Sequence, residues 1–469
     1  MPDTIWQPDL AGYDGPKYLA LAHFLREAVR SGSLPEGQKL PPVRDLAWRL
    51  GITPGTVARA YQIVTQEGLL SAVVGRGTFV AARTAKLGPN QALISDPVVA
   101  GGETVPLIDM RIPEMPDVGQ GRAISAIMHK LADKVGRDYL GYPFLHRDTA
   151  LRDAVADWLS GNEIGPFGAA DIALTNGGQN AIHTVLQCCL RGDRPRIFVE
   201  ELAYPGYRYA ARLNRAEVVP VAMDDEGMRA DALDAACRRQ GGRVVCITPE
   251  AQNPTTIRMS PQRRAEIVAV ARDHDLQIIE DDCYSVRGDP LPALRALASD
   301  RTWYISSLSK SIAAGLRFGM IVCPTGRGEA GRMAAQHSFF GLARPVSDIV
   351  QELLLSGEAV ALRDRVNAVF ARRLEMTLNI LGRYDVAWQR GLSFVWVRLP
   401  LGWRASTFAR RAEAEGVLVR SADEYTVVDG HAPNAIRIAF AGGLSEAAFA
   451  EGLNRLASLL ANPPGDLSI

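Results

Sequence analysis

Lys310 stands in a short run of residue types that could carry out covalent chemistry. The run is Ser306-Ser307-Leu308-Ser309-Lys310, and Gly315-Leu316-Arg317 follows it. A lysine amine forms imines with carbonyl compounds, and serine hydroxyls and an arginine fork bind phosphate oxygens. The spacing therefore predicts an imine-forming lysine beside a phosphate site, although a lone Ser-x-Ser-Lys would usually be a surface loop.

A second group of polar residues ends an apolar run, Ile278-Ile279-Glu280-Asp281-Asp282-Cys283-Tyr284. A carboxylate in this position, aimed at a pyridine nitrogen, keeps that nitrogen protonated and makes the ring an electron sink. Tyr284 could then bond a phenolic oxygen of the same ring. The alternatives are a metal-binding acidic cluster or a loop of solvated charges, and a metal would need more ligands than Asp289 supplies.

Two further motifs precede the acidic strand in the chain. Thr175-Asn176-Gly177-Gly178-Gln179-Asn180 leads into a helical stretch, and free N–H groups at a helix N-terminus attract phosphate. Asn253, in Gln252-Asn253-Pro254, could donate to a phenolate oxygen. Either motif alone is more often an ordinary turn. The four motifs together predict a pyridoxal phosphate site, because each supplies a different part of the surroundings which that cofactor needs.

Short apolar strands and helical stretches alternate from about residue 107 to the end of the chain. The strands include RIFV from Arg196, VVCI from Val244, QIIE from Gln277 and FGMIV from Phe318. Near-continuous apolar strands between helices predict a mainly parallel sheet in an α/β domain. Residues 83–106 hold Gly, Pro, Ser and Asn without sustained periodicity, which predicts a linker, or else a long loop docked on a domain.

The first 82 residues have the pattern of a separate, compact α+β domain. Leu21, Leu25 and Val29 lie at helical spacing, and two further helices are predicted to start near Pro42 and Pro54. Two short strands follow at residues 69–74 and 78–81. Helix, short helix, helix and β-hairpin is the element order of a winged helix-turn-helix.

The stretch LPPVRDLAWRLGITPGTVARAYQIVTQEGLLSAVVGRGTFV closely resembles the GntR family of bacterial regulators. The resemblance implies that the third helix reads the DNA major groove and that the wing approaches the minor groove. Arginines supply charge and hydroxyls suit phosphate oxygens, whereas the alternative is a set of ordinary solvated side chains. Pro54, Gly55 and Ala58 depart from the polar residues of many relatives. The implied DNA-binding residues are Arg44, Thr53, Thr56, Arg59, Gly75, Arg76 and Gly77.

Residues 107–469 resemble the fold-type I aminotransferases of classes I and II, most closely in SSLSKSIAAGLRFGMIV. The resemblance implies that Lys310 forms a Schiff base with pyridoxal phosphate and that Asp281 pairs with the pyridine nitrogen. It also implies that Tyr204 stacks on the ring, while Asn253 and Tyr284 bind the phenolic oxygen. The phosphate would be held by Gly178, Gln179, Ser307, Ser309 and Arg317.

Two residues of the same resemblance concern other molecules. Tyr142 resembles a tyrosine that a partner subunit lends to the phosphate, so a homodimer is expected. Arg437 matches the arginine that binds a substrate carboxylate, the alternative being a strand-edge arginine in a salt bridge. The chain departs from the family pattern at three positions, where Gly, Pro and Gly are usual: Thr256, Leu202 and Arg147.

Composition restricts the remaining possibilities. The 52 Lys and Arg balance the 52 Asp and Glu, yet residues 1–86 hold ten basic and seven acidic side chains. This asymmetry fits DNA contact by the N-terminal part alone. The six Cys lack metal-site spacing, so no metal is expected, and scattered Cys suit a reducing cytoplasm. Neither a signal peptide nor a membrane-spanning run is predicted, so no membrane partner is expected.

A GntR-type head fused to an aminotransferase-like body resembles the MocR subfamily of transcriptional regulators. The resemblance implies a regulator that binds double-stranded operator DNA and senses a small amino compound as an external aldimine at Lys310. One alternative is an active aminotransferase with an accessory DNA-binding head. Another is a GntR-type repressor whose body only dimerises, which would need none of Asp281, Tyr284, Lys310 and Arg317. The effector, the operator and the presence of transamination stay open.

Overall fold

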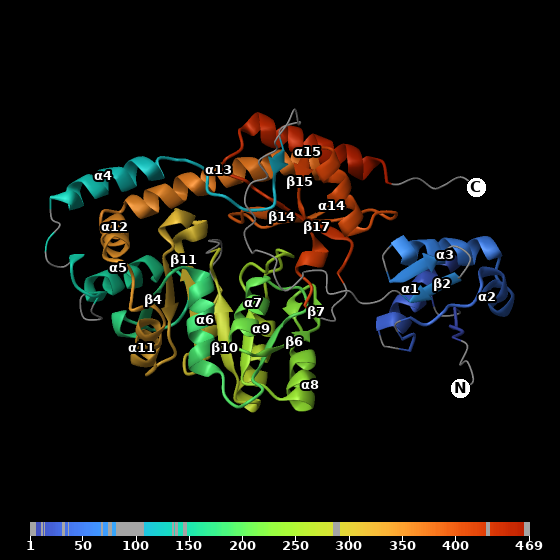
Figure 1. Cartoon of the computed structure of the whole chain (residues 1–469), viewed down its shortest axis with the longest axis horizontal. Helices are drawn as coiled ribbons and strands as arrows, with labels where there is room; N and C mark the ends of the chain where they lie inside the picture. Colours follow the sequence, from blue (N-terminus) through green and yellow to red (C-terminus); the bar gives the residue numbers. More distant parts are fainter. Residues whose placement is uncertain are drawn as a thin grey trace.

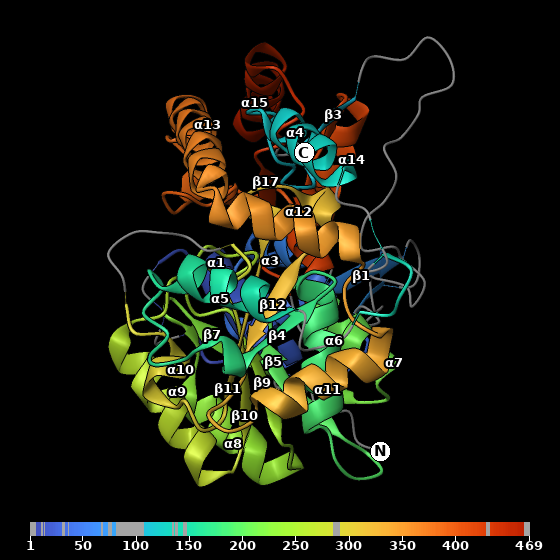
Figure 2. The ribbon, with the colours of Figure 1, turned by 90° about the vertical axis from the view of Figure 1, so that its left-hand side faces the viewer.

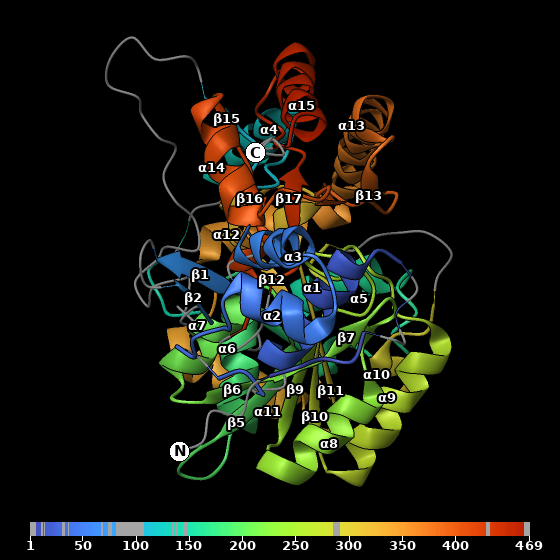
Figure 3. The same ribbon diagram turned by 90° about the vertical axis from the view of Figure 1, so that its right-hand side faces the viewer.

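An N-terminal unit of three helices and a β-hairpin has its own hydrophobic core in the computed structural model of the chain (Figure 1). Helices α1 (Lys17–Arg30) and α2 (Val43–Leu50) both pack on α3 (Pro54–Gln66), and Figure 3 shows these helices from the front. Strands β1 (Leu70–Val73) and β2 (Gly77–Val80) pair antiparallel. Apolar side chains at helical spacing, such as Leu21 and Leu25, are fully buried. This is the predicted winged helix-turn-helix order.

The structure describes most of the remaining chain. The predicted linker at 83–106, together with Gly75, Arg76 and Arg147, lies outside the described residues, so the predictions for them stay predictions. The domain boundaries at 82/83 and 106/107 stay predictions for the same reason. The described residues are 6–10, 13, 15–30, 33–35, 37–66, 69–73, 77–80, 107–133, 136, 139–143, 148–284, 291–427 and 432–463.

A seven-stranded sheet forms the centre of the body, in the order β4-β12-β11-β10-β9-β5-β6. β12 runs antiparallel to both of its neighbours, and the other described pairings in the sheet are parallel. The mainly parallel sheet predicted from the apolar runs is therefore confirmed. The strands are β4 (Ile172–Thr175), β5 (Arg196–Glu200), β6 (Glu217–Val221), β9 (Val244–Ile247), β10 (Gln277–Asp281), β11 (Thr302–Ser307) and β12 (Gly319–Val322).

Helices cover both faces of this sheet (Figure 2). Successive strand residues point to opposite faces, so Ile197 packs with α6 (Gly178–Cys189) and α7 (Gly206–Leu213), whereas Phe198 packs with α8 (Ala230–Gln240) and α9 (Pro261–Asp273). Burial on both faces explains why the strand sequences are almost continuously apolar. The remaining helices near this sheet are α5 (Thr149–Leu159), α10 (Leu294–Leu297), α11 (Gly328–Phe339) and α12 (Arg344–Leu355).

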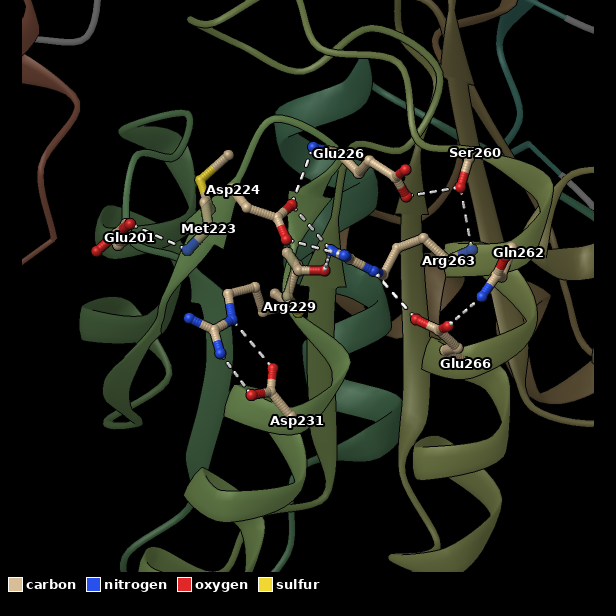
Figure 4. Close-up of polar contacts among 11 residues, drawn as sticks. Glu201, Met223, Asp224, Glu226, Arg229, Asp231, Ser260, Gln262, Arg263 and Glu266 are labelled. Carbon is tan, nitrogen blue, oxygen red and sulfur yellow. Dashed lines mark hydrogen bonds and ion pairs between the residues drawn. The ribbon is translucent and has the colours of Figure 1, made fainter.

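A polar clamp fixes the start of α9 to a small hairpin, β7 (Met223–Asp224) and β8 (Gly227–Met228). Figure 4 shows Arg263 between Asp224, which it binds with both terminal nitrogens at 3.0 and 2.9 Å, and Glu266. Ser260 caps the helix by accepting the Arg263 N–H at 3.2 Å. The clamp therefore holds the start of α9 against the β7–β8 hairpin.

A second, four-stranded sheet lies in the C-terminal part of the chain, in the order β13-β14-β17-β16. Its apolar face packs with three helices in a separate core that includes Val395, Ile438 and Phe449. The short strand β3 (Ile108–Asp109) pairs with β15 (Val417–Leu418) beside this core. The other elements are α4 (Gln120–Ala132), α13 (Glu358–Leu381), β13 (Asp385–Ala387), β14 (Phe394–Arg398), α14 (Ala405–Ala414), β16 (Arg420–Ser421), β17 (Ala435–Ala439) and α15 (Glu446–Ala461).

Candidate functional site

Residues from three elements meet where strands of the large sheet end. Gly178 begins α6, Ser307 ends β11, and Cys283 follows β10 by two residues. A Cβ atom added to Gly178 would lie 2.5 Å from Cys283 Sγ and 4.0 Å from Ser307 Oγ. Open α/β sheets bind ligands at the carboxyl ends of their strands, so this junction is the candidate site.

The three consecutive carboxylates of the acidic run do not converge. Glu280 accepts the backbone N–H groups of Leu294 and Arg295, both at 2.9 Å, and Asp282 accepts a hydrogen bond from the Tyr304 hydroxyl. Within the described ranges, no group of three or more His, Cys, Asp or Glu could hold a metal ion. The geometry therefore gives the metal-cluster interpretation no support.

Asp281 is buried at the end of β10, with only 7% of its surface exposed. Its carboxylate accepts hydrogen bonds from the Tyr207 hydroxyl at 3.3 Å and from the Cys283 N–H at 3.0 Å. Burial raises the pKa of Asp281 above its usual value, although these hydrogen bonds oppose the rise. A cationic ring nitrogen placed against this carboxylate would offset its desolvation.

Lys310 follows β11 by three residues, and its amine is close enough to Cys283 and Arg317 to interact with them electrostatically. The residue is half-buried, and Nζ donates to the carbonyl of Pro113 at 3.3 Å. Desolvation of the ammonium group, helped by the nearby cation of Arg437, lowers the pKa of Lys310 from 10.5 to about 8. A lysine with this pKa holds far more neutral amine near neutral pH, and the neutral amine is the nucleophile.

Arg437 and Asn253 form a buried pair on the side of the second sheet. The Arg437 Nη1 donates to Asn253 Oδ1 at 2.8 Å, and Nη2 donates to the carbonyl of Arg111 at 2.8 Å. The guanidinium lies 5.0 Å from the ring centre of Phe394, whose ring also contacts Tyr284. Because Asn253 Oδ1 accepts from Arg437, its amide nitrogen remains available to donate toward a ligand. The salt bridge that was the alternative role for Arg437 does not occur among the described residues.

Several polar atoms around the glycine turn are set up for an anion. A Cβ atom on Gly177, whose φ is 86°, would lie 2.6 Å from Arg317 Nη2, so only glycine admits this guanidinium. Ser309 Oγ is buried and has no hydrogen-bond partner within the described part of the chain, whereas the Gln179 side chain donates to the Gly206 carbonyl at 3.0 Å, so Gln179 could reach an anion only through its backbone N–H. Buried hydroxyls without partners are rare and point to a missing ligand.

Tyr204 and Tyr142 differ in their relation to the site. Tyr204 is half-buried beside Gly206, where an added Cβ atom would collide with its ring and with Gln179 Oε1. Tyr142 is 73% exposed and stacks on the exposed Phe340, with ring centres 5.7 Å apart. Tyr204 therefore lies beside Gln179 of the predicted site, whereas the described contact of Tyr142 is with Phe340, and its role through a partner subunit stays a prediction.

The head carries the residues that are predicted to contact DNA. Thr53 caps α3, accepting the Thr56 N–H at 3.3 Å, and the two threonine hydroxyls lie 2.9 Å apart. Arg44 is exposed at the start of α2. Arg59 is also exposed, but its guanidinium lies 4.3 Å from the ring centre of Tyr18, so part of its surface is used for packing on α1. Gly77 has a φ of 112°, a conformation that favours glycine.

Sequence reasoning missed three contributors to the site. Tyr207 supplies a hydroxyl to Asp281, Cys283 lines the glycine turn, and the backbone of residues 111–113 accepts bonds from Arg437 and Lys310. Cys283 lay inside the acidic motif and could have been found there. Of the departures from the family pattern, Thr256 has a φ of 67°, where glycine is favoured, and Leu202 is buried and bridges to Thr426.

Comparison with known proteins decides the family. The model of aminotransferase class I and II matches residues 106–456. The chain belongs to this family. The model of bacterial regulatory proteins of the gntR family matches residues 17–80, so this class I and II member carries a GntR-type head, which is the MocR-type architecture.

Similar proteins share the whole arrangement or the body alone. The HTH-type transcriptional regulator YdeF of Bacillus subtilis is 28% identical, over 97% of this chain and 96% of that protein. The probable rhizopine catabolism regulatory protein MocR of Rhizobium meliloti is 24% identical, over 80% and 79%. The crystal structure of an archaeal alanine:glyoxylate aminotransferase has a TM-score of 0.67 at 24% identity, and covers 76% of this chain and 91% of its own. At that identity the structural likeness shows the fold alone.

The residues present in this aminotransferase-like body fit pyridoxal phosphate. Ser309 Oγ and the glycine turn suit its phosphate, buried Asp281 suits a protonated ring nitrogen, and Lys310 carries an amine of lowered pKa. Among the described helices, none is both long and apolar enough to cross a membrane.

Proposed function

We propose that this chain is a transcriptional regulator that binds operator DNA through its head and holds pyridoxal phosphate at Lys310, where a small amino compound changes its DNA binding. The observation that supports it best is that Lys310, an amine of lowered pKa, follows β11, while the buried Asp281 ends the neighbouring strand β10 and the unpaired Ser309 hydroxyl precedes Lys310 in the chain. A body that served only for dimerisation would not need these desolvated polar groups, whose burial costs free energy of folding.

Each part of the site has a proposed task. When bound, pyridoxal phosphate would supply an aldehyde that reacts with primary amines, and Lys310 would supply the amine of the protein at this place. Asp281 holds the ring nitrogen protonated, and Tyr204 lies against the ring. Asn253 and Tyr284 bind the phenolic oxygen. The phosphate is bound by Gly178, Gln179, Ser307, Ser309 and Arg317, and by Tyr142 of a partner subunit in a homodimer.

Arg437 gives the amino compound its second contact. Its guanidinium is buried and its Nε has no partner within the described residues, so it can bind a carboxylate or similar anion. The names of similar proteins support regulation, since most of those reported are transcriptional regulators, and one is the pyridoxine biosynthesis transcriptional regulator PdxR of Corynebacterium glutamicum, 29% identical. An amine that binds one conformation better shifts the population toward it.

The test is spectroscopic. The purified chain mixed with pyridoxal phosphate is expected to show the visible absorbance of an imine, and Lys310→Ala is expected to lose it. Lys130→Ala, which removes an exposed lysine on α4, serves as the control and is expected to keep the absorbance. A colourless wild-type protein in excess cofactor would contradict the proposal.

A second candidate function is transamination. All the side chains needed for it are present, and the 2-aminoadipate transaminase of Thermus thermophilus is 29% identical over 66% of this chain. Turnover of an amino donor with a keto acid, measured beside DNA binding with and without the same donor, separates the two functions. Sustained turnover without any effect on DNA binding would favour the enzyme.

A further inference from the structure

One short segment of the body follows the head along the chain and contacts residues from both sheets' sides of the candidate site. Residues 107–117, here the bridging segment, are the first described part of the body after Val80 of the head. The segment is attached to the second-sheet unit, because the Ile108 N–H donates to Gly416 O and the Met110 N–H donates to Leu418 O, both at 2.9 Å. Along the chain, the segment is therefore the described part of the body that is nearest to the head.

Two cations of the candidate site donate to this segment. Lys310 Nζ donates to the carbonyl of Pro113 at 3.3 Å, and Arg437 Nη2 donates to the carbonyl of Arg111 at 2.8 Å. The two carbonyls are only two residues apart, whereas Lys310 follows β11 of the large sheet and Arg437 lies on β17 of the second sheet. Hydrogen bonds from charged donors are stronger than neutral ones, so these two contacts help to fix the segment.

Other contacts hold the segment independently of the site. Arg420 Nε shares the Arg111 carbonyl at 3.3 Å, and the Gly442 N–H donates to the Glu114 carbonyl at 3.0 Å. Gln120 at the start of α4 donates to the carbonyl of Pro116 at 2.8 Å. Loss of the Lys310 and Arg437 contacts would therefore shift or loosen the segment and would not release it completely.

We propose that the bridging segment reports occupancy of the site to the DNA-binding head. This inference rests on the proposed function. Condensation of an aldehyde with the Lys310 amine releases water and leaves the nitrogen in a C=N bond, so Lys310 no longer offers its ammonium hydrogens to the Pro113 carbonyl. A carboxylate bound at the unpaired Nε of Arg437 shares the guanidinium with the Arg111 carbonyl and so weakens that hydrogen bond. Each lost contact is worth about tenfold in an equilibrium, which lies within the range of known allosteric couplings.

Amide hydrogen exchange of the full chain tests the first step. Pyridoxal phosphate is compared with pyridoxamine phosphate, which offers the same phosphate and ring but cannot bond covalently to Lys310. Exchange at Ile108 and Met110 is expected to be about tenfold faster with the aldehyde than with the amine form. Equal exchange in the two loaded proteins, with the imine absorbance present, would overturn the inference and leave the proposed function intact.

A pair of arginine variants tests the second contact. Arg437→Met removes the donor to Arg111, and Arg208→Met removes a guanidinium that likewise donates to two backbone carbonyls, those of Thr426 and Glu424. Exchange in residues 107–117 is expected to rise about tenfold in Arg437→Met and to stay unchanged in Arg208→Met. An equal rise in both would show a merely structural effect. If Arg437→Met does not fold, the wild-type comparison of the two cofactor forms still decides.

Insertion of Gly-Gly-Ser-Gly-Gly-Ser between Pro106 and Leu107 tests the connection to the head. The probes are pyridoxal phosphate and a DNA duplex that the wild-type chain has selected from a random-sequence pool. In the wild type, the cofactor is expected to change the affinity for this duplex by about tenfold. The insertion should keep the imine absorbance and reduce the change to about twofold or less. A full change in the insertion variant would overturn the inference, whereas absence of the absorbance in both would refute the proposed function.

Discussion

Replacing Lys310 with methionine should make the cofactor-free protein more stable. The environment of this side chain lowers its pKa from 10.5 to about 8, so carrying the charge in the folded chain at pH 7 costs about 3 kcal/mol. The variant also loses the hydrogen bond to Pro113, which offsets about 1 kcal/mol. The free energy of unfolding at pH 7 is therefore expected to rise by about 2 kcal/mol.

The pH dependence gives this prediction its sign. Between pH 8 and 10.5 the unfolded chain keeps a proton that the folded chain has released, so wild-type stability rises with pH across this window. At pH 9.5 the gain of Lys310→Met should accordingly fall below about 1 kcal/mol. Urea unfolding, followed by the fluorescence of the buried Trp303 and Trp396, measures the free energy of unfolding at both pH values. Lys130→Met, at an exposed lysine, is the control. A variant that is no more stable at pH 7, or equally stabilised at both pH values, would refute the reasoning.

Three further substitutions test separate features. Thr256→Gly is expected to raise the free energy of unfolding, measured by urea denaturation, by about 1 kcal/mol. Thr256 has a φ of 67°, a left-handed conformation that glycine adopts without strain. Gly206→Ala should weaken pyridoxal phosphate binding about tenfold or more in an absorbance titration, because its Cβ atom would collide with the Tyr204 ring. Gly315→Ala has open space around its Cβ atom and should bind normally. Arg44→Ala should lower DNA affinity and reduce the salt slope by about one, measured by fluorescence anisotropy, and an unchanged slope would mean that Arg44 does not touch phosphate.

Local patterns in the sequence were sufficient to predict the elements and to indicate which candidate site residues lie near strand ends. The apolar runs predict the strands because both faces of the sheet are buried, and Asp281, Ser307 and Gly178 meet because each lies next to a strand end. Which group each side chain would hold is implied by the resemblance to the aminotransferases and stays a proposal.

Contacts between distant parts of the chain could not be predicted in this way. Arg437 and Arg111 are 326 residues apart, and the acceptor is a backbone carbonyl that any residue type would supply. The hydrogen bond from Lys310 to Pro113 is hidden for the same reason. Tyr207 lies on a helix whose apolar spacing suggests core packing, and only the structure shows that its hydroxyl reaches Asp281.

The reversed direction of β12 has a consequence for the loop that carries Lys310. Because β12 is antiparallel to β11, residues 308–318 leave β11 and enter β12 at the same end of these strands. A parallel strand would instead require a crossover connection to the opposite end of the sheet. Lys310 and Arg317 therefore sit on a short closed span with both ends anchored in a buried sheet. Because both ends of this span are anchored, we expect it to move little on ligand binding, and we expect larger movement in the second sheet, which carries Arg437.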